Sequence, residues 1–118
     1  MTDKDIIHIA AVNGWKAAIW EEPDGIKCVT FQRYMRSGIQ FDFTVEMKDC
    51  RAKSLAAEII SLVDAIDPKA CAREWMMKSG IVSPTMFNRA VADMDGIRTE
   101  VWMLACAFLE FIGGSILP

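Results

Sequence analysis

Residues 39 to 47 read Ile-Gln-Phe-Asp-Phe-Thr-Val-Glu-Met, and apolar and polar side chains alternate at every position. Successive side chains of a β-strand point to opposite faces, so this pattern predicts a strand with one apolar and one polar face. A sheet that is dry on one side and wet on the other is typical of antiparallel strands covered on one face only. The stretch therefore predicts an antiparallel sheet with other elements packed on one side.

Three further strands are expected upstream of this stretch. The apolar run 6–12 precedes Asn13-Gly14, a pair that suits a type I′ hairpin turn and predicts a partner strand over 15–21. A turn with proline and glycine then leads to a strand over 26–34. With the alternating stretch, these segments predict a four-stranded antiparallel meander.

Downstream, the spacing of apolar residues changes from two to that of one face of a helix. Asp49 is expected to cap a first helix. Its apolar stripe consists of Leu55, Ile59, Leu62, Val63 and Ile66.

Two later segments begin with a capping residue followed by proline, the order that starts a helix. Asp67-Pro68 predicts a second helix that ends before Gly80, and Ser83-Pro84 predicts a third. The apolar stripe of the third consists of Phe87, Ala90, Val91 and Met94.

The elements combine into one expected architecture. Gly96 is expected to break or kink the chain before a last helix over 97–112. The sequence thus predicts a single α+β domain over 1–118, with a sheet between 5 and 47 packed against three to four helices between 50 and 112.

The composition narrows the range of partners and the cellular compartment that can be expected for this chain. The chain has 118 residues and a net charge of −3, and 53% of the residues are hydrophobic. The mild negative charge argues against a non-specific nucleic-acid binder, and the hydrophobic surplus favours a partner or self-association. The start lacks the basic and apolar regions of a signal peptide, so a cytoplasmic protein with reduced thiols is expected. The four cysteines form no Cys-x-x-Cys pair: Cys28, Cys50, Cys71 and Cys106.

The sequence has few residues and motifs that usually act in catalysis or bind a metal or phosphate. The only histidine, His8, lies in an apolar segment, where a packed or edge residue is the ordinary interpretation. No nucleophile elbow, metal-ligand spacing or glycine-rich phosphate loop is present, so neither catalysis nor a cofactor is expected. An enzyme built from acidic residues that meet only in the folded chain is the remaining alternative.

Two apolar stretches are candidates for binding a partner. Residues 101–109 are apolar throughout, which predicts either a central core helix or a self-association or partner surface. The run is too short to span a membrane, which needs about 20 residues. Trp75, Met76 and Met77 are consecutive in the second helix and cannot all point inward. The candidate contacts are Trp75, Met76, Met77, Trp102 and Phe108.

Basic residues offer a competing interpretation. Lys48, Arg51 and Lys53 gather where the sheet passes into the first helix, where an anion or a solvated junction is expected. Residues 69–94 resemble a helix-turn-helix, which presents polar residues of its second helix to DNA, although such pairs are usually packing units. The candidate nucleic-acid contacts there are Lys78, Thr85, Asn88 and Arg89.

Four short stretches resemble small accessory proteins of bacterial phages and mobile elements: 55–60, 65–68, 73–76 and 92–94. By analogy with anti-CRISPR proteins, the resemblance implies a non-catalytic inhibitor of host defence. The leading hypothesis is a protein–protein interaction module, because apolar helix surface is in excess and no catalytic motif is present; a homodimer through the last helix is one form of it. The alternative is a nucleic-acid-binding transcriptional regulator.

Overall fold

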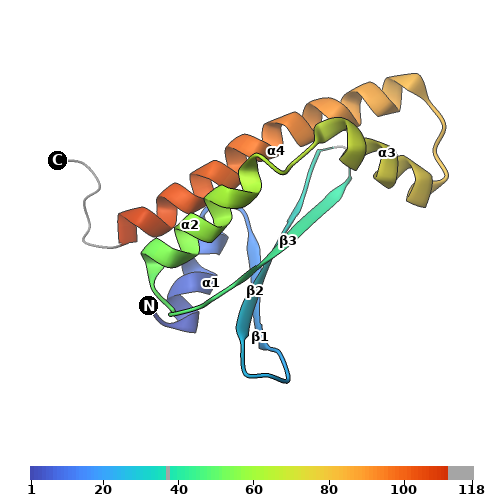
Figure 1. The fold of residues 1–118 in the computed structure, drawn as a ribbon. Coiled ribbons are helices and arrows are strands. Elements are labelled where there is room, and N and C mark those ends of the chain that lie inside the picture. Colours follow the sequence, from blue (N-terminus) through green and yellow to red (C-terminus); the bar gives the residue numbers. More distant parts are fainter. Residues whose placement is uncertain (37, 112–118) are drawn as a thin grey trace.

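The computed structural model describes residues 1–36 and 38–111, which form an α+β fold of four helices and a three-stranded sheet. In chain order the elements are α1 (Asp3–Val12), β1 (Lys16–Glu21), β2 (Lys27–Tyr34), β3 (Gln40–Glu46), α2 (Ala52–Val63), α3 (Pro68–Ser79) and α4 (Pro84–Phe111). Figure 1 shows α2 and α4 lying together over one side of the sheet, with α3 beside the N-terminal half of α4.

The sheet is antiparallel, with the strand order β1-β2-β3, as a meander requires. Its third strand keeps the alternation seen in the sequence. Ile39, Val45 and Met47 are buried and Phe41 and Phe43 are partly buried, whereas the polar residues between them are exposed. The covered face of the sheet thus points toward the helices, and the open face points to solvent.

The prediction of a strand over 6–12 is wrong, because these residues belong to helix α1. Thr2 and Asp5 form a capping box: the Thr2 amide donates to Asp5 Oδ2 at 2.8 Å, and the Asp5 amide donates to Thr2 Oγ1 at 3.2 Å. Ile6 and Ala10, four residues apart, are the buried residues of the helix. The sheet therefore has three strands instead of four.

Asn13-Gly14 ends α1 instead of forming a hairpin turn. Gly14 has φ +84°, and its amide donates to the Ala11 carbonyl at 3.1 Å. The Trp15 amide donates to the Ala10 carbonyl at 2.8 Å, which completes the Schellman arrangement of a helix C-terminus. A type I′ turn and this cap both use a positive φ, so the same residue pair serves either.

The starts of α3 and α4 follow the prediction. Asp67 accepts hydrogen bonds from the amides of Lys69 and Ala70, and Ser83 Oγ accepts one from the Met86 amide at 3.3 Å. Gly96 does not break the chain, since α4 runs continuously for 28 residues. The predicted end at residue 112 lies outside the described residues.

Asp49 is not the N-cap of α2, which is Arg51. Asp49 instead accepts two hydrogen bonds that stabilise the turn before the helix. It accepts from the Arg51 amide at 3.0 Å and from Ser54 Oγ at 2.8 Å. Cys50, between Asp49 and Arg51, has φ +56°.

The core lies between the sheet and the helical layer. Phe31 of β2 and Phe108 of α4 are both completely buried, with ring centroids 5.9 Å apart. The other large side chains that are fully buried are Ile6, Val29, Ile59, Met94, Ile97, Val101 and Leu104.

Arg33 joins three elements at one edge of this core. Its Nη1 donates to the Asn13 carbonyl at 3.2 Å and to Glu100 Oε2 at 3.1 Å. Its guanidinium carbon lies 5.5 Å from the centre of the buried Trp15 ring. The end of α1, strand β2 and helix α4 are thereby linked through one side chain.

In the described part of the chain, no helix is long and apolar enough to cross a membrane.

Candidate functional site: the outer stripe of α4 and the groove between β3 and α3

Helix α4 changes character along its solvent side. The outward positions of its N-terminal half carry small and polar side chains, namely Thr85, Asn88, Arg89, Ala92, Asp95 and Thr99. From residue 102 the outward positions are apolar except for the exposed Glu110. We call Trp102, Met103, Cys106, Ala107 and Phe111 the α4 stripe.

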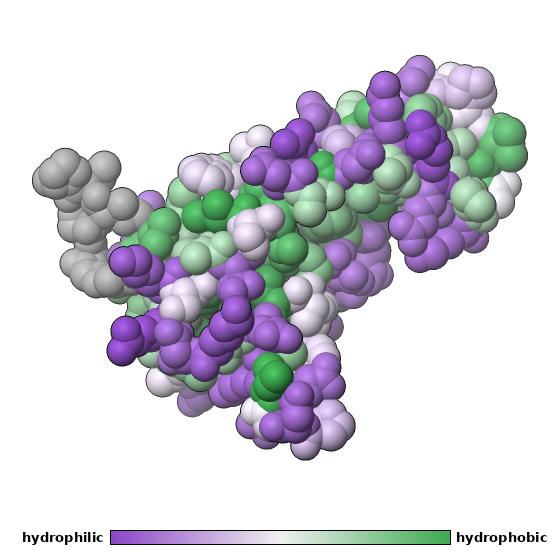
Figure 2. Space-filling view, in the orientation of Figure 1, coloured by the Kyte–Doolittle hydropathy of each residue, from purple (hydrophilic) through white to green (hydrophobic). Residues whose placement is uncertain are grey.

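The α4 stripe contains large side chains that the rest of the described chain leaves half exposed. Trp102 is 48% exposed, Met103 51% and Phe111 46%. In Figure 2 polar residues dominate around the N-terminal half of α4, and apolar ones appear around its C-terminal half. A shallow hollow of about 370 Å³ adjoins Trp102 and is also lined by Val63 and Arg98. Asp95 also lines this hollow, and Arg98 lies 3.9 Å from Asp64 Oδ1, so charged groups of both signs border the apolar surface.

Phe108 does not belong to this surface. It is fully buried against Phe31, so the expectation that it contacts a partner is not compatible with the structure. The apolar run 101–109 is thus divided between two roles. Val101, Leu104, Ala105 and Phe108 face the core, and Trp102 and Met103 face outward.

The three consecutive apolar residues of α3 also separate. Trp75 is half-buried and packs against the core, Met76 is partly buried, and Met77 is 83% exposed. The connection after α3 holds Val82, which is almost fully exposed, and Figure 2 shows apolar atoms at that end of the molecule.

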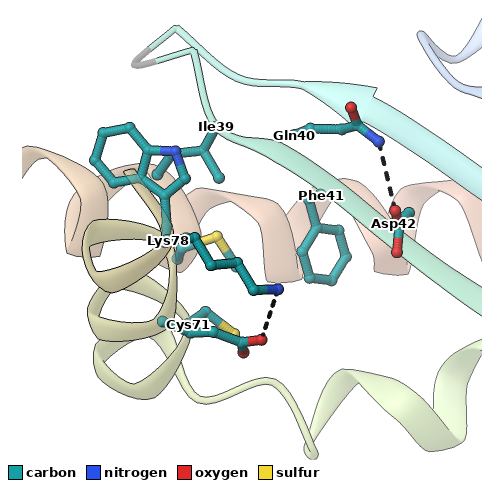
Figure 3. Close-up of a pocket in the computed structure, with 9 residues that line it drawn as sticks. Ile39, Gln40, Phe41, Asp42, Cys71 and Lys78 are labelled. Atoms are coloured by element: carbon teal, nitrogen blue, oxygen red, sulfur yellow. Dashed lines mark hydrogen bonds and ion pairs between the residues drawn. The ribbon is translucent and has the colours of Figure 1, made fainter. Parts of the chain in front are cut away.

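Trp75 lines a groove of about 350 Å³ between α3 and the free edge of β3. Figure 3 shows Lys78 of α3 reaching toward the groove, where its Nζ lies 3.0 Å from Glu74 Oε1. On the strand side, Gln40 Nε2 lies 3.5 Å from Asp42 Oδ2. The lining residues are Ile39, Gln40, Phe41, Asp42, Cys71, Glu74, Trp75, Lys78 and Met94.

The cationic residues near α2 are brought to one region but differ in their contacts. All three are exposed, and Lys48 Nζ lies 3.3 Å from Glu58 Oε1. Arg51 and Lys53 border a hollow of about 460 Å³ that also includes Met1 and Phe111. The anion-binding role of these residues stays a prediction.

The helix pair proposed to bind DNA places its polar residues at the surface. Thr85, Asn88 and Arg89 are exposed at the start of α4. Lys78, the phosphate contact expected beside them, instead pairs with Glu74 and lines the groove. Gly80, between the helices, has φ +68° and ends α3 as predicted.

Groups suited to catalysis do not converge in the described residues. His8 is exposed on α1, and no cluster of three or more metal-ligating side chains occurs among residues 1–36 and 38–111. Burial raises the pKa of the Cys28 thiol, and burial also raises that of Cys71 in the groove, so both favour the protonated form.

Sequence reasoning named Trp75, Met76, Met77 and Trp102 but missed Met103, Phe111 and the groove. Met103 has no separate signal in the uniformly apolar run 101–109, because only the burial of Leu104 and Phe108 shows which side of the run is covered. The groove has no local signal, since it forms between residues 39–42 and 71–78, which are far apart in the sequence. Comparison with protein-family models, curated proteins and solved structures finds no match to this chain.

Proposed function

We propose that this protein acts without catalysis, by binding another protein through the α4 stripe. The observation that carries the proposal is the exposure of Trp102, Met103 and Phe111 in the C-terminal half of a helix whose other half is polar outside. Tryptophan and methionine are enriched at protein interfaces, and tryptophan is also enriched where interfaces concentrate their binding energy. Arg98, at the edge of the hollow beside Trp102, pairs with Asp64 at 3.9 Å, and such charged groups are typical of interface rims.

The stripe is better suited to a protein than to a small ligand. The hollow beside Trp102 is shallow, and the apolar residues follow the helix over three turns. A small-molecule site is usually a concave cavity that encloses its ligand. A partner that lays an apolar face along α4 would cover Trp102, Met103 and Cys106 together.

The resemblance to accessory proteins of phages and mobile elements supports an inhibitory role. Components of bacterial defence systems, CRISPR nucleases included, are therefore the partners to test first. A second copy of this chain on the same stripe is the self-association form of the proposal.

Site-specific photo-crosslinking tests the proposal. A photoreactive amino acid at position 102 should give a discrete crosslinked product in cells, and one at the outward position 92 should not. Trp102→Ser with Met103→Ser should abolish the product in a chain crosslinked through position 106. The proposal fails if no product forms at 102, or if 92 gives the same product.

Nucleic-acid binding is the second candidate, supported by the exposure of Thr85, Asn88 and Arg89 at the start of α4. Its weakness is that Lys78 is paired with Glu74, which leaves few phosphate contacts. Binding to duplex DNA at about 50 mM salt, weakening steeply as salt rises, is the expected behaviour of this alternative. Absence of binding at low salt would remove it.

A further inference from the structure

Strand β3 is an edge strand whose outer backbone groups have a definite pattern. The Met35 amide donates to the Ile39 carbonyl, and the Met47 amide donates to the Lys27 carbonyl, both at 2.8 Å. These two bonds mark both ends of the β2–β3 ladder. In an antiparallel ladder, hydrogen-bonded pairs alternate with pairs whose backbone groups point away.

The alternation therefore assigns the inward groups of β3 to its odd-numbered residues. The N–H and C=O groups of Gln40, Asp42, Thr44 and Glu46 point away from β2. Within the described residues, no hydrogen bond satisfies these outward groups. Such an edge is a template for one more strand.

The groove lies along this edge. Four consecutive residues, 39 to 42, line it, and consecutive residues of a strand point to opposite faces. A cavity lined by all four must therefore run beside the backbone edge. The opposite wall consists of Cys71, Glu74, Trp75 and Lys78, which share one side of α3 by their spacing of three and four. Figure 3 shows this space between β3 and α3.

The apolar and charged side chains that line the groove determine which kind of ligand fits it. Phe41, Trp75 and Met94 supply apolar surface on the helix side. Asp42 is exposed on the open face of the sheet, and the only cation of the lining, Lys78, is already paired with Glu74. The groove thus has one carboxylate more than it has cations.

We propose that this groove binds an extended segment of another protein as a fourth strand antiparallel or parallel to β3. Backbone groups of the segment pair with Gln40 and Asp42, and alternate side chains point toward Phe41 and Trp75. The residues between them lie on the open face, where a lysine or arginine meets Asp42. Affinity comes mainly from the backbone bonds, and the alternation of apolar and basic residues gives the selectivity. The site is separate from the α4 stripe.

A synthetic peptide tests the proposal on the full-length protein labelled with ¹⁵N. The probe is acetyl-Val-Lys-Val-Lys-Val-amide, and the matched control is acetyl-Val-Glu-Val-Glu-Val-amide. The lysine peptide should shift the amide signals of residues 39–42 and of α3, and should bind at least about tenfold more tightly than the glutamate peptide. A lysine peptide methylated on alternate backbone nitrogens should lose binding. Equal binding of the two peptides, or shifts outside the groove, would overturn the proposal.

Variants separate backbone pairing from charge. Asp42→Arg should reverse the preference between the lysine and glutamate peptides without affecting the ladder to β2. Gln40→Pro removes an outward N–H inside the groove, whereas Glu46→Pro removes the same kind of group beyond it; proline is tolerated where the N–H faces outward. Only Gln40→Pro should weaken binding. If Asp42→Arg leaves the preference unchanged, Asp42 does not select basic residues.

Trp102→Ser should not affect peptide binding, so a failure of the groove proposal is distinguishable from a failure of the α4 stripe proposal.

Discussion

Replacing Phe108 by alanine should be among the most destabilising single changes in this chain, and replacing Phe111 by alanine among the mildest of its aromatic changes. Both residues lie near the end of α4 and lose the same atoms, but Phe108 is completely buried and Phe111 is 46% exposed. Truncating a buried phenylalanine to alanine costs about 3 to 5 kcal/mol, because the transfer energy of the ring is lost and a cavity forms. Phe108 also loses its ring contact with Phe31 at 5.9 Å. For Phe111 we expect a cost of about 1 kcal/mol or less.

Urea denaturation followed by far-ultraviolet circular dichroism measures the difference. The Phe108→Ala midpoint should fall strongly with an unchanged slope, and its thermal midpoint should fall by roughly 4 °C per kcal/mol. Because a domain of this size is stable by only about 5 to 15 kcal/mol, Phe108→Leu provides a milder variant, with an expected cost of about 1 kcal/mol. If Phe108→Ala costs no more than Phe111→Ala, the assignment of Phe108 to the core is refuted.

Three further outcomes follow from single contacts. A double-mutant cycle of Arg33→Met and Glu100→Gln should give a coupling of about 1 kcal/mol by urea denaturation, because the pair is only partly exposed; additive effects would contradict the contact. The Ser54 hydroxyl and the Arg51 amide lower the pKa of Asp49 below 3.8, so its contribution is present at neutral pH and is lost as pH falls through that lower pKa. Asp49→Asn should therefore be less stable than the parent at neutral pH and equal to it in strong acid, and a constant difference would be evidence against this. Cys50→Gly should raise the free energy of unfolding by about 0.5 to 1 kcal/mol, because glycine adopts φ +56° without strain; a thermal midpoint below that of the parent would exclude strain at this position.

The parts of the fold that could be predicted are those with a local cause. The alternation over 39–47 identified β3 and its covered face, and the capping residues Asp67 and Ser83 marked the starts of α3 and α4. The apolar run 6–12 is rich in β-branched residues and by itself favours a strand, whereas the Thr2–Asp5 capping box before it starts helix α1. The β-propensity of a short run depends on what it packs against, whereas a capping box satisfies amides within the same turn.

The candidate site was predictable only in part, for a related reason. An apolar run such as 101–109 does not show which of its sides the core covers, and only the packing of Leu104 and Phe108 fixes that Trp102 faces outward. The groove depends on the distance between β3 and α3, which no pattern within either segment determines.

The continuous course of α4 through Gly96 has a mechanical consequence. At about 1.5 Å per residue, 28 residues make a rod roughly 42 Å long. One end of the rod bears the α4 stripe, and the other supports α3 and the groove. Two ligands held at these places would keep a nearly constant separation, so a tethered pair of ligands should gain from its linker only when the linker spans that interval.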